Sequence, residues 1–232
     1  MEVIILAGGL GTRLRSVVSE VPKCMAPISD KPFLWYLLKY LTRFDISRVV
    51  LSVGYLKEVI FNWIETCRSE FPFVIDYSVE ESPLGTGGGI KLALSKILSK
   101  EAIILNGDTF FDVDLNLLLK THQKQMSANI TIALKTMEKF DRYGTVEADG
   151  DGKILQFNEK KPCKRGVING GIYIINKKAT IFEDLPEKFS FETKVLQKYC
   201  GEKGSIYGVI QEGYFIDIGV PEDYIKANIE LK

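Results

Sequence analysis

The first half of the sequence alternates short, wholly apolar runs with longer amphipathic segments, and this alternation constrains the fold more than any other feature. Residues 3–6 are apolar at every position, which favours a strand buried on both faces of a parallel sheet. A helix is expected from Pro32, because apolar side chains follow it at spacings of three and four. Repeated units of this kind predict a parallel sheet with helices on both faces. The further units are predicted strands at 49–53, 73–79 and 102–105 and predicted helices at 56–67 and 88–98.

The second half is richer in predicted strands and has no internal repeat or Pro/Ser-rich linker. Residues 149–152, Asp-Gly-Asp-Gly, are typical of a hairpin turn between strands. We therefore expect one α/β domain over residues 1–232, a Rossmann-like three-layer α/β/α arrangement around a mixed, mostly parallel sheet. The elements predicted in this half are strands at 129–136, 145–147, 153–157 and 167–175 and helices at 192–199 and from Pro221.

Composition excludes three broad classes of protein. Hydrophobic residues make up 46% of the 232, which is enough to fill a core and excludes a disordered chain. No apolar run approaches the roughly 18 residues of a membrane span, so no membrane partner is expected. The 30 basic residues balance 30 acidic ones, and this neutrality argues against a broad nucleic-acid-binding face.

The cysteines and the single histidine offer little catalytic chemistry. Cys24, Cys67, Cys163 and Cys200 lie far apart and form no CxxC pair, so their spacing does not suit zinc. The N-terminus carries an acid where a signal peptide needs basic residues, so reduced thiols and a cytoplasmic location are expected. We expect His122 to be a solvated helix residue rather than a catalytic base, which disfavours a histidine-dependent hydrolase.

A glycine-rich loop, LAGGLGTRL at residues 6–14, follows the first predicted strand. Glycines let backbone N–H groups approach a phosphate closely. A P-loop is excluded because no Lys-Ser/Thr pair follows, and a dinucleotide motif is disfavoured because Leu14 replaces the third glycine. The remaining interpretation is a loop for a nucleoside triphosphate, with Arg13 and Lys23 as its cations. A plain turn would not explain two basic groups beside so many glycines.

The same segment resembles a known family signature. GGLGTRLRSVVSEVPKCMAPI is similar to GGxGTRLxPxTxxxPKPMxPI of the sugar-1-phosphate nucleotidyltransferases, and five separated segments agree in order along the whole chain. The sequence departs from the signature at Arg15-Ser16, near the usual proline, and at Cys24, which replaces another proline. Neither change removes a charged group, so we expect altered loop detail rather than altered chemistry. The finer resemblance is to D-glycero-D-manno-heptose 1-phosphate guanylyltransferases, through PLGTGG, NGDTFFDVDL, DRYGTV, INGGIY, EKFSFE and YFIDIGVPEDY.

The resemblance implies a nucleotidyltransferase (GT-A-like) fold and a Mg²⁺-dependent reaction. A nucleoside triphosphate, with GTP expected, and a sugar 1-phosphate, with the heptose expected, would give a nucleotide sugar and pyrophosphate for surface polysaccharide synthesis. Residues 1–125 would bind the nucleotide and residues 126–232 the sugar phosphate. The resemblance also leaves room for a homodimer. The alternatives are a mannose-1-phosphate guanylyltransferase or another family member, a non-catalytic nucleotide-binding protein, and a glycosyltransferase using the DxD spacing of Asp112 and Asp114.

The matching positions carry expected roles. Asp108 and Asp217 each follow an apolar strand, where α/β proteins build ligand sites, and the resemblance assigns them to Mg²⁺. The base loop is 83–89, with Glu80 or Glu81 nearby, and its residues do not identify the base. The expected catalytic residues are Arg13, Lys23, Asp108, Lys160 and Asp217. The expected nucleotide-binding residues are Leu6, Ala7, Gly8, Gly9, Gly11, Thr12, Arg13, Lys23, Gly85, Thr86 and Gly107. The expected sugar-phosphate-binding residues are Gly144, Glu159, Lys160, Asn169 and Gly170.

Overall fold

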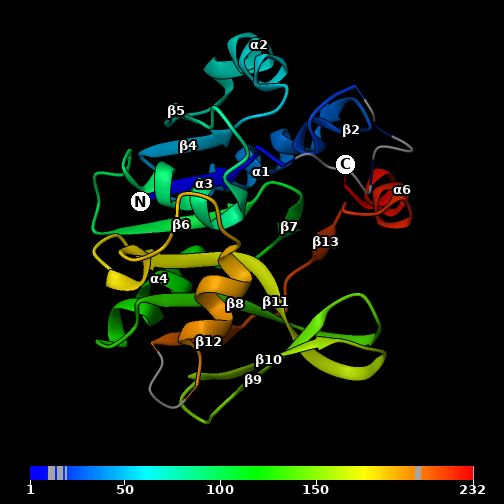
Figure 1. The fold of residues 1–232 in the computed structure, drawn as a ribbon. Coiled ribbons are helices and arrows are strands. Elements are labelled where there is room, and N and C mark those ends of the chain that lie inside the picture. Colours follow the sequence, from blue (N-terminus) through cyan, green and yellow to red (C-terminus); the bar gives the residue numbers. More distant parts are fainter. Residues whose placement is uncertain (10–13, 15–17, 19, 202–204, 232) are drawn as a thin grey trace.

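A mixed sheet forms the centre of the computed structural model, which describes residues 1–9, 14, 18, 20–201 and 205–231. Its strand order is β10-β9-β11-β6-β1-β4-β5, with β8 beside β11 and β12 beside β8 (Figure 1). The first-half strands β6, β1, β4 and β5 run parallel, and β11 joins β6 in the antiparallel sense. Its strands are β1 (Glu2–Leu6), β4 (Arg48–Val53), β5 (Val74–Val79), β6 (Glu101–Asn106), β8 (Ile130–Phe140), β9 (Gly144–Ala148), β10 (Ile154–Lys160), β11 (Cys163–Asn176) and β12 (Ile206–Ile210).

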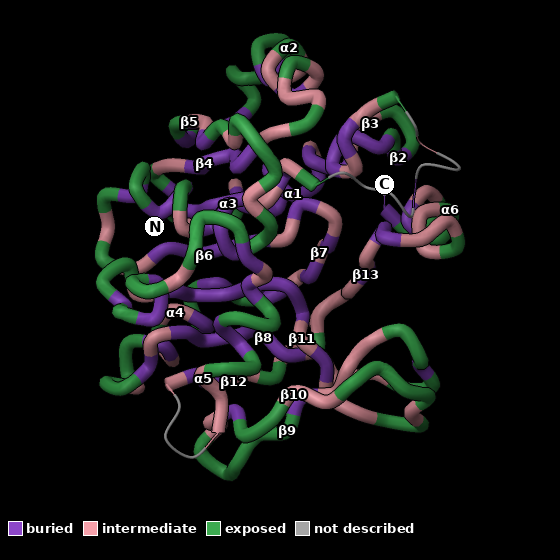
Figure 2. The backbone as a smooth tube through the Cα atoms, in the orientation of Figure 1, coloured by how far each residue is buried: buried purple, intermediate pink, exposed green. Residues whose placement is uncertain are grey.

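Helices cover both faces of this sheet because its strands are apolar on both sides. In β1, Val3 and Ile5 join one buried cluster with α1, α2 and α4, whereas Ile4 joins a second cluster with α3 and the π-helix η4. The expected three-layer α/β/α arrangement is confirmed, and Figure 2 shows the buried strands between the layers. The helices are α1 (Phe33–Leu41), α2 (Lys57–Cys67), α3 (Gly85–Leu94), α4 (Leu115–Lys124), η4 (Glu192–Leu196), α5 (Gln197–Tyr199) and α6 (Pro221–Glu230), with short 3-10 turns η1 (Lys23–Met25), η2 (Arg68–Glu70) and η3 (Thr180–Phe182).

Two small ladders lie outside the main sheet. β7 (Thr109–Phe111) pairs with β13 (Phe215–Asp217) in the antiparallel sense, with Thr109 opposite Asp217. β2 (Pro27–Ile28) pairs with β3 (Lys31–Pro32). The β7–β13 ladder joins segments that are about a hundred residues apart in the sequence. An apolar strand before Asp217 was expected, whereas β7 and the pairing were not.

Most predicted elements are confirmed, and the differences have physical causes. Helix α3 begins at Gly85, three residues before the predicted start, because Gly87 and Gly88 allow it to approach the segment 187–189. A Cβ atom on Gly87 would lie 2.1 Å from the Phe189 ring, and one on Gly88 would lie 2.1 Å from the Glu187 carbonyl oxygen. Glycine therefore serves close packing in this helix, against its low helix propensity.

The expectation that His122 is solvated is wrong. His122 lies on α4, which packs against β8, and only 4% of the residue is exposed. Its Nδ1 atom is 2.8 Å from Thr131 Oγ1. Burial lowers the pKa of His122 to about 4. The residue is thus part of the packing, as its contacts with β8 show.

Among the described residues, no helix has the length and apolarity that crossing a bilayer requires.

Candidate active site

A cleft of about 1350 Å³ opens where the carboxyl ends of β1, β4 and β6 meet the hairpin of β9 and β10. Most of the site residues expected from the sequence line it. Arg13, Gly11 and Thr12 lie outside the described residues, and Gly170 does not line the cleft. The expected residues that do line it are Leu6, Ala7, Gly8, Gly9, Lys23, Gly85, Thr86, Gly107, Asp108, Gly144, Glu159, Lys160, Asn169 and Asp217.

Lys23, Asp108 and Asp217 converge on one side of the cleft. The Lys23 ammonium is 2.6 Å from Asp108 Oδ2, and the lysine side chain is only 13% exposed. The backbone N–H of Gly219 donates a hydrogen bond of 2.7 Å to Asp217 Oδ1. A Cβ atom on Gly219 would lie 2.7 Å from that same carboxylate oxygen and 3.1 Å from Lys23 Nζ. The lysine and the two carboxylates therefore meet around one point.

The β7–β13 ladder brings the two aspartates together. Asp108 directly precedes β7, and Asp217 is the last residue of β13. The backbone N–H of Ile218 donates a hydrogen bond of 2.9 Å to the Asp108 carbonyl oxygen. Because the ladder fixes both backbones, the spacing of the carboxylates does not depend on long, flexible side chains.

The two carboxylates suit a divalent cation. Burial, followed by the negative charge of Asp108, raises the pKa of Asp217, and Lys23 offsets this only in part. Besides burial, the raised pKa reflects repulsion between two ionised carboxylates, which a divalent cation would relieve. No group of three or more His, Cys, Asp or Glu side chains that could hold a metal occurs in the described part of the chain. Two carboxylates completed by phosphate oxygens and water are the arrangement in which Mg²⁺ is commonly bound.

Glu80 lies in the nucleotide half of the cleft, beneath the start of α3. Its Oε2 atom accepts a hydrogen bond of 3.0 Å from the Leu84 backbone N–H. Its Oε1 atom accepts one of 3.3 Å from Ser52 Oγ. Both partners line or border the cleft, whereas Glu81 does not line it. The structure thus selects Glu80 from the two glutamates near the base loop.

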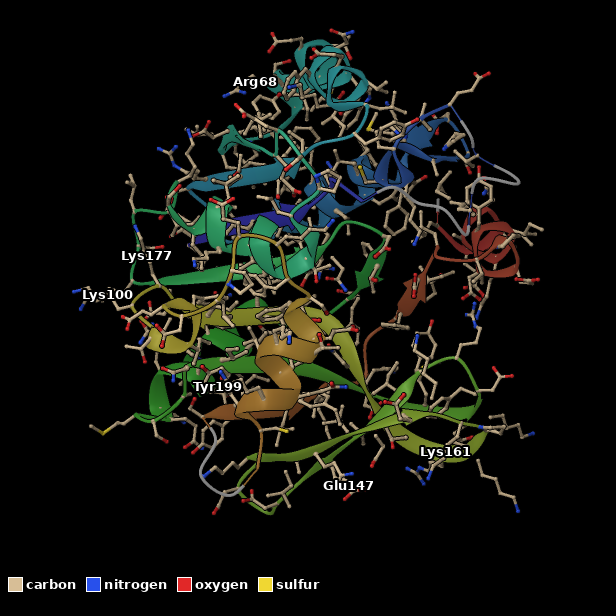
Figure 3. The ribbon with its side chains drawn as sticks, viewed as in Figure 1. Arg68, Lys100, Glu147, Lys161, Lys177 and Tyr199 are labelled. Atoms are coloured by element: carbon tan, nitrogen blue, oxygen red, sulfur yellow. The ribbon has the colours of Figure 1, made fainter. Side chains whose placement is uncertain are left out.

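The β9–β10 hairpin supplies the opposite wall. Lys160 pairs with Gly144 across its ladder, which places the lysine and Glu159 beside the cleft. Glu147 of β9 and Lys161, which directly follows β10, are labelled in Figure 3, and neither lines the cleft. Lys160 and Lys161 are therefore neighbours in the sequence with different access to the site.

A bulge in β11 shapes the floor between the two walls. The register with β8 shifts between Asn169 and Tyr173, and Gly171 has a φ of 76°. Asn169 Nδ2 donates a hydrogen bond of 3.0 Å to the Tyr173 hydroxyl, and Asn169 Oδ1 accepts one of 2.9 Å from the Gly171 N–H. Gly171 lines the cleft, whereas a Cβ atom on Gly170 would lie 2.5 Å from the Phe111 ring. Gly170 thus faces β7.

The comparison with protein families agrees with this geometry. The family described as nucleotidyl transferase matches residues 2–232. The chain belongs to this family.

Curated relatives and a solved structure resemble this nucleotidyl transferase along its full length. D-glycero-alpha-D-manno-heptose 1-phosphate guanylyltransferase of Aneurinibacillus thermoaerophilus is 49% identical over 232 residues, covering 100% of this chain and 99% of the relative. The protein of that name from Campylobacter jejuni is 49% identical over 227 residues, covering 97% of each. The crystal structure of HddC from Yersinia pseudotuberculosis complexed with GMP-PN is 38% identical, with a TM-score of 0.87, and the match covers 100% of this chain and 99% of that one.

In this nucleotidyl transferase, the DxD segment has structural partners away from the cleft. Asp112 forms an ion pair with Arg43. Asp114 caps α4 by accepting hydrogen bonds from the N–H groups of Asn116 and Leu117, at 2.9 and 3.1 Å. Because neither carboxylate lines the cleft, the observation that favoured a glycosyltransferase has another explanation.

Sequence reasoning missed several residues that line the cleft. Most of them lie in DRYGTV and EKFSFE, two segments that resemble the family but whose side chains were given no role, whereas Thr193 and Gln197 lie beyond the second segment. A signal was present, since Arg142 and Lys188 are cations within those segments. The missed residues include Arg142, Tyr143, Lys188, Ser190, Glu192, Thr193 and Gln197.

Proposed function

We propose that this nucleotidyl transferase joins GTP to D-glycero-α-D-manno-heptose 1-phosphate and releases pyrophosphate. The convergence of Lys23, Asp108 and Asp217 in a cleft that also contains Glu159 and Lys160 carries the proposal. Such a site can hold two phosphorylated partners and a metal ion side by side. The printed names of the two relatives at 49% identity support the choice of sugar and base.

The reaction is a displacement at the α-phosphorus of the triphosphate. An oxygen of the sugar phosphate forms a bond to that phosphorus, and the bond to the bridging β-phosphate oxygen breaks with its electron pair leaving on pyrophosphate. Two anions must approach, so the barrier is chiefly electrostatic and positional. The nucleophile is already anionic, and the step needs no covalent enzyme intermediate.

The cations of the chain divide this work. Lys23 would leave Asp108 to neutralise the α-phosphate, where negative charge develops. Arg13, which lies outside the described residues, would hold the β- and γ-phosphates. Lys160 would pair with the attacking sugar phosphate, and Glu159 and Asn169 would hold sugar hydroxyls. Residues 1–125 thus serve chiefly the nucleotide and residues 126–232 the sugar phosphate.

Asp108 and Asp217 would hold the divalent ion, which we take to be Mg²⁺ because both donors are hard oxygens. Once bound, it would neutralise phosphate charge and align the triphosphate for displacement. The carboxylates would keep this charge at the α-phosphate side of the cleft, since the β7–β13 ladder fixes their position.

Glu80 supports guanine as the base. An ionised carboxylate only accepts hydrogen bonds, and guanine presents two neighbouring donors, its N1–H and its 2-amino group. Glu80 lines the cleft, and its carboxylate is oriented by hydrogen bonds from the Leu84 N–H and the Ser52 hydroxyl. A base whose edge offered acceptors at this position would be repelled.

We place the reaction in the cytoplasm as a step in the supply of surface-polysaccharide precursors. All four cysteines are free thiols, which suits a reducing compartment. A homodimer is compatible with the resemblance of the sequence to the family, and measurement of the molecular mass in solution would test it.

A matrix of four nucleoside triphosphates against several sugar 1-phosphates, with pyrophosphate as the readout, tests the proposal. We expect GTP with the heptose 1-phosphate to give the highest kcat/KM, above GTP with mannose 1-phosphate. Lys160→Ala should raise the KM for the sugar phosphate at least tenfold, whereas Lys161→Ala should leave it within about twofold.

Three outcomes would replace the proposal. Preference for mannose 1-phosphate would indicate a mannose-1-phosphate guanylyltransferase. Sugar transfer from a nucleotide sugar, without pyrophosphate release from any triphosphate, would indicate a glycosyltransferase. Tight nucleotide binding by calorimetry with no turnover in Mg²⁺ would indicate a non-catalytic binding protein.

A further inference from the structure

Arg142 is a cation at the cleft to which the resemblance of the sequence assigned no role. It lies between β8 and β9 and lines the cleft together with Tyr143 and Gly144. Its side chain is 40% exposed and forms an ion pair with Asp223, in the first turn of α6. The guanidinium also lies 5.6 Å from the centre of the Tyr143 ring.

The surroundings of Tyr143 hold Arg142 close to the two aspartates. The Tyr143 ring makes an edge contact with Phe215 of β13, at 5.9 Å between ring centres and an interplanar angle of 78°. Phe215 is two residues before Asp217 on the same strand. Arg142 is near enough for its charge to act on Asp217. Strand β13 therefore carries Asp217 and also contacts the Tyr143 ring beside Arg142.

Lys160 approaches the same region from the neighbouring strand. It pairs with Gly144, two residues after Arg142, across the β9–β10 ladder. The two cations consequently border the cleft from neighbouring segments, Arg142 from the loop before β9 and Lys160 from the end of β10, on the side that we assign to the sugar phosphate.

A count of charges indicates that one more cation is needed there. The basic residues of the described lining are Lys23, Arg142, Lys160 and Lys188, and the acidic ones are Glu80, Asp108, Glu159, Glu192 and Asp217. Lys23 is already paired with Asp108, and Lys188 adjoins Phe189, which packs on the start of α3 beside the base loop. A sugar phosphate carries close to two negative charges at neutral pH, and Lys160 supplies one positive charge. Arg142 is the described lining cation that lies two residues before Gly144, the ladder partner of Lys160, and its own partner Asp223 does not line the cleft.

We propose that Arg142 binds the phosphate of the sugar 1-phosphate together with Lys160, and that Asp223 holds its guanidinium until this substrate arrives. The inference rests on the proposed function, because it concerns the second substrate of that reaction. A planar guanidinium can donate two parallel hydrogen bonds to phosphate oxygens. The exchange of a carboxylate for a phosphate keeps the guanidinium paired in both states.

Steady-state kinetics with Arg142→Met, Arg142→Lys and Asp223→Asn test the inference. They use the preferred GTP and sugar 1-phosphate pair of the wild-type enzyme. We expect Arg142→Met to raise the KM for the sugar phosphate at least tenfold and to leave the KM for GTP within about twofold. Arg142→Lys keeps the positive charge and should raise the KM for the sugar phosphate less than Arg142→Met does. Asp223→Asn frees the guanidinium, so the KM for the sugar phosphate should stay within threefold or fall.

Calorimetric titration of each variant with the sugar 1-phosphate alone separates binding from turnover. Thermal unfolding checks that each variant folds. Two results would overturn the inference. One is an Arg142→Met variant whose KM and dissociation constant for the sugar phosphate are unchanged. The other is an equal rise of this KM in Asp223→Asn and Arg142→Met, which would show that the ion pair matters only for structure. If Arg142→Met does not fold, a tenfold rise in the KM for the sugar phosphate in Asp223→Asn is sufficient to reject the inference. Failure of the proposed function would appear separately, as a wild-type enzyme that releases no pyrophosphate with any pair.

Discussion

Lys23 has two mutually exclusive partners in the proposed reaction. Its ammonium is paired with Asp108 at 2.6 Å, beside Asp217. This is the position at which a divalent ion would neutralise the two carboxylates. The lysine therefore stabilises the carboxylate pair in the free protein, and it becomes available to the α-phosphate when another cation takes over that role.

Replacement of Lys23 should affect the chemical step. We expect Lys23→Ala to lower kcat by about 100-fold or more, because deletion of one group that stabilises developing charge costs about 3 kcal/mol. Lys39→Ala, at an exposed position on α1, serves as the control and should change kcat little. The measurement is pyrophosphate release at saturating substrates. A kcat within about twofold of the parent in a folded variant would show that the assigned role is wrong.

The same lysine should oppose metal binding in the absence of nucleotide. We expect Lys23→Met to bind Mn²⁺, used as a probe, several-fold more tightly than the parent, because the competing ammonium is gone. Asp108→Asn is the opposite control and should weaken binding. Titration calorimetry without nucleotide measures both. Equal or weaker binding of Mn²⁺ by Lys23→Met would contradict the competition.

At the scale of single elements, tertiary contacts decide what local sequence preference does not. Helix α4 was expected only as the helical setting of His122, without bounds, and the burial of His122 against β8 was not expected. Helix α3 begins with glycines that local propensity disfavours. The deciding contacts come from outside each helix: Thr131, nine residues after His122, for α4, and the distant segment 187–189 for α3.

Burial of His122 should make the protein less stable in acid. The unfolded histidine gains a proton near pH 6.5, whereas the folded one remains neutral down to about pH 4. The free energy of unfolding should therefore fall as the pH drops through this window, by roughly 3 kcal/mol from this residue. Chemical denaturation at several pH values measures it. His122→Asn places an amide near the position of Nδ1 and should remove that part of the pH dependence; an unchanged slope would show that His122 does not contribute.

At Gly88, helix propensity and packing predict changes of opposite sign in the free energy of unfolding. Helix propensity alone predicts that Gly88→Ala stabilises α3 by about 1 kcal/mol. The contact with the Glu187 carbonyl oxygen, 2.1 Å from the new Cβ, predicts destabilisation by about 1–3 kcal/mol. We expect the second result in urea unfolding. Gly150→Ala, where nothing lies within 4 Å, is the control and should be nearly neutral. A more stable Gly88→Ala variant would show that segment 187–189 shifts at little energetic cost to accommodate the new Cβ atom.

For the whole molecule, the sequence predicts the layers better than the assembly of the site. Continuous apolar runs such as residues 3–6 identify buried strands because their composition alone reflects burial on two faces. The pairing of β7 with β13 leaves no comparable local pattern, since each strand has three residues and its partner is about a hundred residues away. The roles of Lys23, Asp108 and Asp217 were expected from the family resemblance, but their common meeting point required the fold. Arg142 was missed for the same reason.

The two halves of the chain should not fold independently. Strand β6 lies between β1 and β11, and the second buried cluster combines Ile4 and Val50 with Ile132 and Val195. A fragment of residues 1–125 would expose this apolar surface. We expect it to lack a cooperative urea transition by circular dichroism, whereas the full chain unfolds cooperatively. A sharp transition in the fragment would indicate an autonomous nucleotide-binding unit.

The β7–β13 ladder also has a consequence for protein synthesis. Asp108 emerges from the ribosome about a hundred residues before Asp217, and the ladder cannot form until both segments are available. During that interval the glycine-rich loop and Lys23 already exist, but the second carboxylate is missing. Because the first half should not fold alone, neither the proposed phosphate-binding surface nor the proposed metal pair should form before the second half has emerged. Catalytic competence should arrive in one late step of translation rather than increase gradually with chain length.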